Sequence, residues 1–277
     1  MAVFTVNGNA NNFTGTALAD TFQGFSGGID NLRGMAGNDR FDINNWSQQR
    51  GRIDGGVGID RIVMEGHNNH TFNTSLIIVG VEELWADEPN FYASVTQINA
   101  FSKFVPTNSE NWWAINILGN GGTLNFTGKY TGAKVLEIDA TNAETKVTVT
   151  GSGKKDDFQG SEFNDVWVGG AGADEATGNG GNDVFRFNAI SESTVAAPDR
   201  ILDFFGGDKI NVSALQGPAL VYRGTGAFTN TGQLRIVDVA GPDVVVQVNT
   251  VGGLGADFAI RIVDVMLAEI TKTDFIL

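Results

Sequence analysis

Residues 169–176 decide the fold of this chain. They read Gly169-Gly170-Ala171-Gly172-Ala173-Asp174-Glu175-Ala176, a glycine-rich stretch that ends in an aspartate and, two positions later, an apolar residue. Around this stretch aspartate recurs every nine residues, at Asp156, Asp165, Asp174 and Asp183. An apolar residue follows two positions after each of them, at Phe158, Trp167, Ala176 and Phe185. This is the nonapeptide repeat pattern of parallel β-helices.

The nine-residue period predicts how the chain winds. Each repeat supplies one turn and one short strand, so two repeats form one flat rung of about 18 residues. Turns on one edge then stack, which pairs Asp156 with Asp174 and Asp165 with Asp183. The apolar residues face inward and form a thin core. We therefore predict an all-β protein, a parallel β-roll or β-solenoid, with a further β-rich segment at its C-terminus.

A second block of the same pattern lies near the N-terminus. Asp30 and Asp39 are nine residues apart, and Asp20 precedes them at a spacing of ten. Another complete repeat, Gly55-Gly56-Val57-Gly58-Ile59-Asp60-Arg61-Ile62, follows after an insertion that contains Trp46. The N-terminal block therefore predicts further solenoid rungs.

The spacing of these residues suits calcium. Glycine lets the turn backbone adopt positive φ and direct its carbonyls inward. Carboxylate and carbonyl oxygens from adjacent rungs then form the multi-oxygen cage that Ca²⁺ prefers, whereas Mg²⁺ requires a tighter octahedron. The predicted metal-binding residues are Asp30, Asp39, Asp60, Asp156, Asp165, Asp174, Asp183, Gly56, Gly58, Gly170, Gly172 and Gly181.

A stack of turns that hydrogen-bonds itself and binds no metal is the alternative interpretation. The repeats that end at Asp156 and Asp165 depart from the pattern, because Lys154 and Phe163 replace their fourth-position glycine. Phe25 and Ser26 replace the leading glycines before Asp30. We expect these turns to be the ones without an ion, so that two to four calcium ions are bound in all.

Composition narrows the functional classes. The 277 residues include 18 Lys and Arg against 32 Asp and Glu, a formal charge of −14. This balance argues against nucleic acid and anionic membrane surfaces as partners. The absence of cysteine excludes disulfides and thiolate chemistry. No stretch approaches the ~20 apolar residues that cross a bilayer, and no N-terminal signal peptide is expected.

The repeats resemble those of RTX proteins, which bacterial type I systems export and calcium folds outside the cell. Asp199-Arg-Ile-Leu-Asp203-Phe204-Phe-Gly-Gly207-Asp208-Lys-Ile-Asn-Val-Ser213 resembles the segment that follows the repeats in serralysin-type secreted proteases. The ending Thr273-Asp274-Phe275-Ile276-Leu277 is similar to their uncleaved secretion signal. The resemblance implies calcium as cofactor, a secreted or cell-surface location and the type I machinery as partner. It does not extend to a calcium loop near the end, where Asn249 and Gly253 stand at expected aspartates.

The sequence divides into four predicted segments. These are residues 1–62, an N-terminal RTX-like repeat block; 63–150, a central β-solenoid ladder without calcium motifs; 151–213, a second RTX repeat block; and 214–277, a C-terminal β segment with the secretion signal. Short β-rich runs in the central segment begin near Ser75, Asn111, Gly122, Lys134 and Lys146.

Catalytic signals are weak. Serralysins carry H-E-x-x-H in a preceding protease domain, whereas this chain has only His67-Asn-Asn-His70, which lacks both the glutamate and the i, i+4 spacing. Glu82, Glu83, Asp87 and Glu88 could supply a carboxylate pair of the glycosidase type. We expect no enzyme, and keep a polysaccharide-acting enzyme as an alternative.

Aromatic residues gather in the central segment, where core filling is their default role. Trp112 and Trp113 are adjacent, and neighbours on a strand face opposite sides. We therefore expect one of these two tryptophans to lie off the core and contact a partner or glycan. The expected function is an extracellular, calcium-binding structural or adhesive protein that self-assembles on the cell surface or as a layer or filament. A carbohydrate-binding lectin is the alternative.

Overall fold

The structure is a computed structural model of the whole chain. It describes residues 1–25, 28–43, 50–66, 69–87, 90–107, 113–215 and 220–277. The chain forms two compact units, one of residues 1–124 and 128–136 and one of residues 125–127 and 137–277. The predicted division into four segments differs from these units and stays a prediction. Short strand β14 (Thr123–Asn125) lies at the division between the two units.

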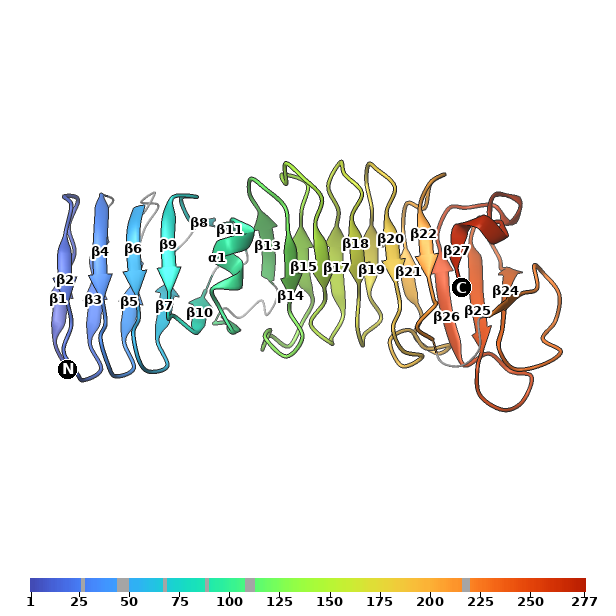
Figure 1. Cartoon of the computed structure of the whole chain (residues 1–277), viewed down its shortest axis with the longest axis horizontal. Coiled ribbons are helices and arrows are strands. Elements are labelled where there is room, and N and C mark those ends of the chain that lie inside the picture. Colours follow the sequence, from blue (N-terminus) through green and yellow to red (C-terminus); the bar gives the residue numbers. More distant parts are fainter. Residues whose placement is uncertain (26–27, 44–49, 67–68, 88–89, 108–112, 216–219) are drawn as a thin grey trace. The chain divides into compact units, whose positions relative to one another are not determined.

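Three parallel ladders make up the first unit (Figure 1). The first contains, in spatial order, β1 (Val3–Thr5), β3 (Thr21–Gln23), β5 (Arg40–Asp42), β7 (Arg61–Met64), β10 (Glu83–Ala86) and β12 (Lys103–Pro106). The second contains β2 (Asn12–Thr14), β4 (Ile29–Arg33), β6 (Arg50–Asp54) and β9 (Leu76–Val79). The third contains β8 (His70–Thr71), β11 (Asn90–Ala93) and β13 (Trp113–Ile117).

Register in these ladders puts equivalent apolar residues directly over one another. Phe4 pairs with Phe22 and Phe22 with Phe41, and the rings stack at centroid distances of 4.8 Å. Phe22 and Phe41 are fully buried. The apolar residue two positions after each aspartate therefore forms the core, as the sequence predicted.

The rungs lengthen and gain a third side in the central part of the chain. Arg61 pairs with Glu83 and Glu83 with Lys103, at separations of 22 and 20 residues. The helix α1 (Val95–Asn99) occupies one corner, capped by Ser94 and Gln97 in a capping box. Gln97 also donates to the carbonyls of Asn73, at 2.7 Å, and Leu76, at 3.0 Å. Within the described ranges no helix has the length and apolarity needed to cross a membrane.

Two sheets make up the second unit, and both begin as parallel ladders. One contains β15 (Leu136–Asp139), β17 (Asp156–Gln159), β19 (Glu175–Thr177), β21 (Asp199–Ile201), β26 (Phe258–Ile262), β25 (Val244–Asn249), β24 (Gln233–Asp238) and β23 (Val221–Tyr222). The other contains β16 (Thr148–Thr150), β18 (Val166–Val168), β20 (Val184–Arg186), β22 (Lys209–Asn211) and β27 (Phe275–Ile276). Asp157 pairs with Glu175 and Val166 with Val184, so the predicted 18-residue rung is confirmed.

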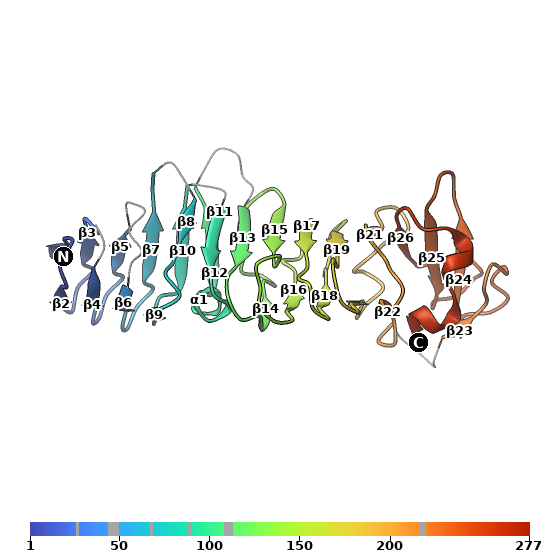
Figure 2. The same ribbon diagram turned by 90° about the horizontal axis from the view of Figure 1, so that it is seen from above.

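The C-terminal end of this unit changes from parallel to antiparallel pairing. β24, β25 and β26 form an antiparallel meander, and β26 joins the parallel ladder through β21 (Figure 2). Two short 3₁₀ turns, η1 (Leu267–Glu269) and η2 (Lys272–Asp274), precede β27. The predicted fold class, an all-β parallel β-solenoid with a C-terminal β-rich segment, is confirmed.

Candidate metal centre: columns of buried aspartates

The first unit carries a column of acidic side chains along one edge. The backbone N–H of Asp20 donates to Oδ1 of Asp39 at 2.7 Å, and the N–H of Asp39 donates to Oδ1 of Asp60 at 2.7 Å. The N–H of Asp60 donates to Oε2 of Glu82 at 2.8 Å, which ends the column. Each carboxylate therefore accepts a hydrogen bond from the rung before it.

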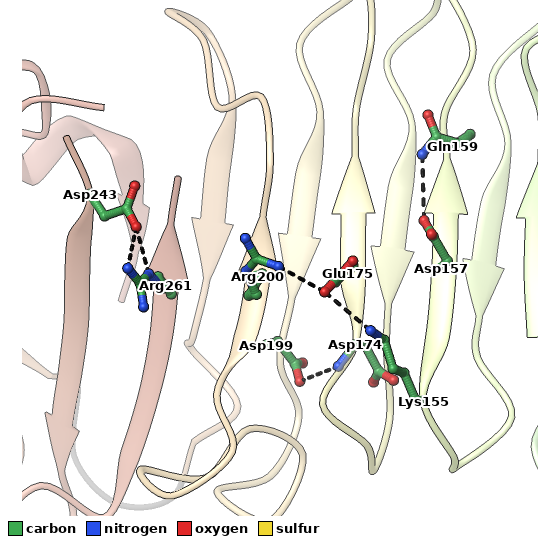
Figure 3. A network of polar contacts seen from close by, with 9 residues as sticks. All are labelled: Lys155, Asp157, Gln159, Asp174, Glu175, Asp199, Arg200, Asp243 and Arg261. Atoms are coloured by element: carbon green, nitrogen blue, oxygen red, sulfur yellow. Dashed lines mark hydrogen bonds and ion pairs between the residues drawn. The ribbon is translucent and has the colours of Figure 1, made fainter. Parts of the chain in front are cut away.

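Two more columns follow the same rule in the second unit. On one edge the N–H of Asp156 donates to Oδ1 of Asp174 at 2.8 Å, and the N–H of Asp174 donates to Oδ1 of Asp199 at 3.0 Å (Figure 3). The other edge stacks three further aspartates through equivalent bonds of 2.8 and 2.9 Å, in the order Asp165, Asp183 and Asp208. The predicted pairs, Asp156 with Asp174 and Asp165 with Asp183, are confirmed.

The second oxygen of several of these carboxylates lies buried without a hydrogen bond. This applies, among the described residues, to Oδ2 of Asp39, Asp60, Asp174, Asp183 and Asp199. Their side chains are at most 3 % exposed. A buried carboxylate that keeps its charge needs a compensating partner, because desolvation of an isolated charge costs many kcal/mol.

Burial raises the pKa of these groups. It raises the pKa of Asp183 to about 7, helped by the charge of Asp208, and the pKa of Asp174 to about 7, helped by the charge of Asp156. Burial and the charge of Asp174 raise the pKa of Asp199 to about 8. Burial raises the pKa of Asp156 to about 7 and that of Asp60 to about 6. Without a cation, the columns therefore hold protons that a free aspartate would release.

Glu175, on the outer face, behaves differently. Glu175 lies next to Asp174 in the sequence but points outward, where it accepts from Lys155 at 3.1 Å and from Arg200 at 2.9 Å (Figure 3). Burial alone would raise its pKa, but these two cations lower it. Oδ2 of Asp174 and Oδ2 of Asp199 have no hydrogen-bond partner among the described residues, so these oxygens are left for a ligand to neutralise.

The glycines of the repeat make room for the carboxylates. A Cβ on Gly169, five residues before Asp174, would lie 2.5 Å from its Oδ2 atom, and a Cβ on Gly178 would likewise overlap Oδ2 of Asp183. The predicted ligand residues Gly56, Gly170 and Gly181 have φ of 99°, 86° and 109°. A Cβ on Gly58 would overlap the Gly37 carbonyl and one on Gly172 would overlap the Lys154 carbonyl, so both glycines lie against an adjacent rung.

These residues fit calcium better than a metal that needs several side-chain ligands. Among the described residues no group of three or more His, Asp or Glu side chains is placed to hold a metal together. One carboxylate per turn with tightly packed backbone carbonyls is instead a hard, all-oxygen donor set. A bound ion would supply positive charge next to the Oδ2 atoms that lack a hydrogen-bond partner.

Sequence reasoning missed some members of the columns and placed Asp30 with them. Asp30 lies on another edge, where it accepts from Asn11 at 2.9 Å and faces Gly51 in the next rung. Asp199 and Asp208 escaped the nine-residue count because an insertion separates them from the previous rung by 25 residues. The signal was present, because an isoleucine follows two positions after each.

Trp113, one of the two tryptophans of the lectin prediction, lies in the core. Trp113 is fully buried and packs against Phe91 and Phe104, at ring distances of 6.4 and 6.2 Å. Trp113 is therefore not the tryptophan that lies off the core, because both faces of β13 are covered; that one of the two contacts a partner or glycan stays a prediction. Trp112 lies outside the described residues.

The carboxylates of the enzyme alternative have structural partners. Glu82 ends the first column, and Glu83 accepts from Lys103 at 2.9 Å and from Trp85 Nε1 at 2.8 Å. Oδ1 of Asp87 lies 3.6 Å from Nε2 of His70, which is 9 % exposed. Glu88 and His67 lie outside the described residues.

The loop at Asn249 is held together by hydrogen bonds of Asn249 and Asp257. Nδ2 of the buried Asn249 donates to the carbonyls of Gly253, at 3.1 Å, and Gly255. Asp257 accepts the N–H groups of Thr250 and Val251 at 2.8 and 2.7 Å. The Asn249 amide therefore satisfies these carbonyls, while its own Oδ1 atom is buried without a hydrogen-bond partner among the described residues. That this loop holds no calcium stays a prediction.

Comparisons with known proteins give a family match for part of the second unit and a similar solved structure. Residues 163–277 match the family described as Peptidase M10 serralysin C terminal. Among solved structures, the chain is similar to the AlgE6R3 subunit of a mannuronan C5-epimerase from Azotobacter vinelandii, with 22 % identity and a TM-score of 0.38. The similarity covers 57 % of this chain and 80 % of that one. No curated protein matches the chain.

Substituting alanine for Gly178 should destabilise the fold and weaken calcium binding, because the added methyl overlaps Oδ2 of Asp183. The control is Gly206→Ala, since a Cβ there meets no atom within 4 Å. Urea unfolding with and without calcium gives both quantities. Equal loss in the two variants would show that the carboxylate does not need the glycine.

Calcium-free protein should lose stability as the pH rises from about 4 to about 8. The raised carboxyl pKa values mean that the folded state holds more protons than the unfolded chain across this window, so the free energy of unfolding falls with pH. The measurement is urea unfolding in chelator at several pH values. A midpoint that stays constant or rises over this range would contradict the burial of ionisable carboxyls.

Proposed function

We propose that this chain is an extracellular calcium-binding β-roll protein with a structural or adhesive role, which folds when it meets calcium. The carrying observation is the set of buried aspartates in register whose Oδ2 atoms have no partner among the described residues. The match of residues 163–277 to the serralysin C-terminal family supports a secreted, calcium-binding repeat.

Asp39, Asp60, Asp174 and Asp183 would hold the ions, together with turn carbonyls. A bound divalent cation supplies the positive charge that each column lacks. An ion present at 100-fold its dissociation constant adds ~2.7 kcal/mol to stability. A few such ions decide folding, since whole domains are stable by only ~5–15 kcal/mol. At low cytosolic calcium the columns repel and the chain stays unfolded for export; at millimolar calcium outside the cell it folds.

Export by a type I system and the lack of a catalytic role belong to the same proposal. The resemblance of residues 273–277 to a secretion signal supports export by a type I system. The structural roles of Glu82 and Glu83 support the lack of a catalytic role, because both carboxylates are engaged within the fold. Self-assembly into a layer or filament stays a prediction.

Calcium should convert the protein from a weakly ordered to a β-rich state, and Asp174→Asn should weaken this response. Asparagine keeps an Oδ1 acceptor for the N–H of Asp156 but removes the charge, so the variant should be more stable than wild type in chelator and require more calcium to reach full β content. The readout is far-UV circular dichroism during a calcium titration.

Asp157→Asn is the matched control, because Asp157 neighbours Asp156 in the same strand but points outward. It should leave the calcium midpoint unchanged. Identical spectra of wild-type protein in chelator and in millimolar calcium would remove the proposal.

Glycan binding is a second candidate, favoured by a hollow lined by residues of β2, β4 and β6. Its volume is about 300 Å³, and its lining residues are Asn12, Phe13, Thr14, Asn31, Leu32, Arg33 and Arg52. Arg52 pairs with Asp54 at 2.8 Å, whereas the side chain of Arg33 makes no hydrogen bond or ion pair with any described residue. Amides and a hydroxyl recognise sugar hydroxyls, and a free guanidinium recognises a carboxylate or sulfate. The fitting ligand is an acidic polysaccharide.

Arg33→Gln should weaken binding of an acidic oligosaccharide roughly tenfold, the loss expected for one charge-assisted hydrogen bond. Titration calorimetry in millimolar calcium would compare a polyuronate, a sulfated glycan and a neutral glucan. Arg186→Gln is the control, because Arg186 is also exposed on a strand and makes no contact of this kind with the described residues. Equal affinity for the neutral glucan, or equal loss in both variants, would contradict the site.

A further inference from the structure

Seven aspartates of the columns share a glycine five positions earlier, yet they differ at the residue four positions earlier. They are Asp20, Asp39, Asp60, Asp156, Asp165, Asp174 and Asp183. Their residues four positions earlier are Thr16, Met35, Gly56, Ser152, Ser161, Gly170 and Asn179. The carboxylates fall into two classes according to this residue.

In three turns a hydroxyl residue satisfies the carboxylate. The N–H of Ser152 donates to Oδ2 of Asp156 at 2.6 Å, and its Oγ donates to Oδ1 at 2.7 Å. Ser161 makes the equivalent bonds to Asp165, with its N–H at 2.6 Å from Oδ2. Thr16 does the same for Asp20, with N–H and Oγ1 at 2.5 and 2.9 Å from Oδ2. None of these three residues has positive φ.

In the other four turns the residue at this position has positive φ and donates no hydrogen bond to Oδ2 of the aspartate. The angles are 81° at Met35, 99° at Gly56, 86° at Gly170 and 63° at Asn179. In these turns Oδ2 of the following aspartate is buried without a hydrogen-bond partner among the described residues, at Asp39, Asp60, Asp174 and Asp183. The division holds for all seven turns.

Backbone conformation explains the division. Serine and threonine avoid positive φ, because their Cβ clashes with the backbone there. With negative φ their N–H faces the carboxylate, and the hydroxyl adds a second donor. Where φ is positive the N–H turns away: the N–H of Asn179 donates instead to Asp203 at 2.7 Å. Met35 is a non-glycine residue at positive φ, a strained conformation that persists only where the surroundings require it.

We propose that the residue four positions before each aspartate decides whether its turn requires an ion. Turns with serine or threonine at this position are closed by the protein itself, and turns with positive φ hold calcium through the orphaned Oδ2. Calcium is then assigned to Asp39, Asp60, Asp174 and Asp183, and not to Asp20, Asp156 or Asp165. This inference rests on the proposed calcium-binding function and names which of its sites bind.

The test counts calcium ions bound per folded chain by native mass spectrometry, with circular dichroism as a check of folding. Asp174→Asn should lose one ion, whereas Asp156→Asn, in the adjacent rung of the same column, should lose none. Ser152→Gly should gain one ion, because glycine gives no hydroxyl and allows positive φ. Ser152→Ala, which keeps negative φ and the N–H donor, should bind the wild-type number.

The outcomes separate this inference from the function on which it rests. A wild-type chain that binds no calcium would remove both. Calcium binding with one ion lost in both Asp174→Asn and Asp156→Asn would keep the function and overturn the assignment. An equal count in Ser152→Gly and Ser152→Ala would overturn the role of the backbone angle.

Discussion

The structure depends on one repeated hydrogen bond, from the backbone N–H of an aspartate to Oδ1 of the aspartate one rung later. This bond sets the register of the turns and requires the carboxylate to lie inside the edge of the solenoid. Burial follows for every aspartate of a column, as at Asp39 and Asp174. The glycine five positions earlier follows as well, because Oδ2 occupies the place of its side chain.

The same bond stacks negatively charged carboxylates inside the turns, at an electrostatic cost. Stacked carboxylates repel one another, and burial removes the water that would screen them. On the outer face the chain pairs its charges, as in the row of Lys155, Glu175 and Arg200. Inside the turns, Thr16, Ser152 and Ser161 donate hydrogen bonds to Asp20, Asp156 and Asp165, and the N–H of Phe205 donates one to Asp208. The remaining oxygens need either protons or a cation, and this need is the physical basis of the calcium dependence that we propose.

Much of the fold follows from periodicity. The 18-residue rung, the inward apolar residues and the pairs Asp156–Asp174 and Asp165–Asp183 were all predictable, because stacking in register allows a fixed repeat only one arrangement. Prediction failed where insertions break the period. Asp199 and Asp208 complete their columns 25 residues later than the preceding aspartates. The burial of Trp113 was not predictable, because alternation along a strand does not reveal that both faces of β13 are covered.

The sequence by itself determined the class of fold, the residues that face inward and the acidic edges, since each of these depends on local spacing. Only the tertiary structure decided which carboxylate oxygens are satisfied. That outcome depends on the direction of a single N–H group four residues before each aspartate, and hence on backbone angles set by packing. Met35 and Asn179 show this most clearly, because both adopt a positive φ that their residue type does not predict.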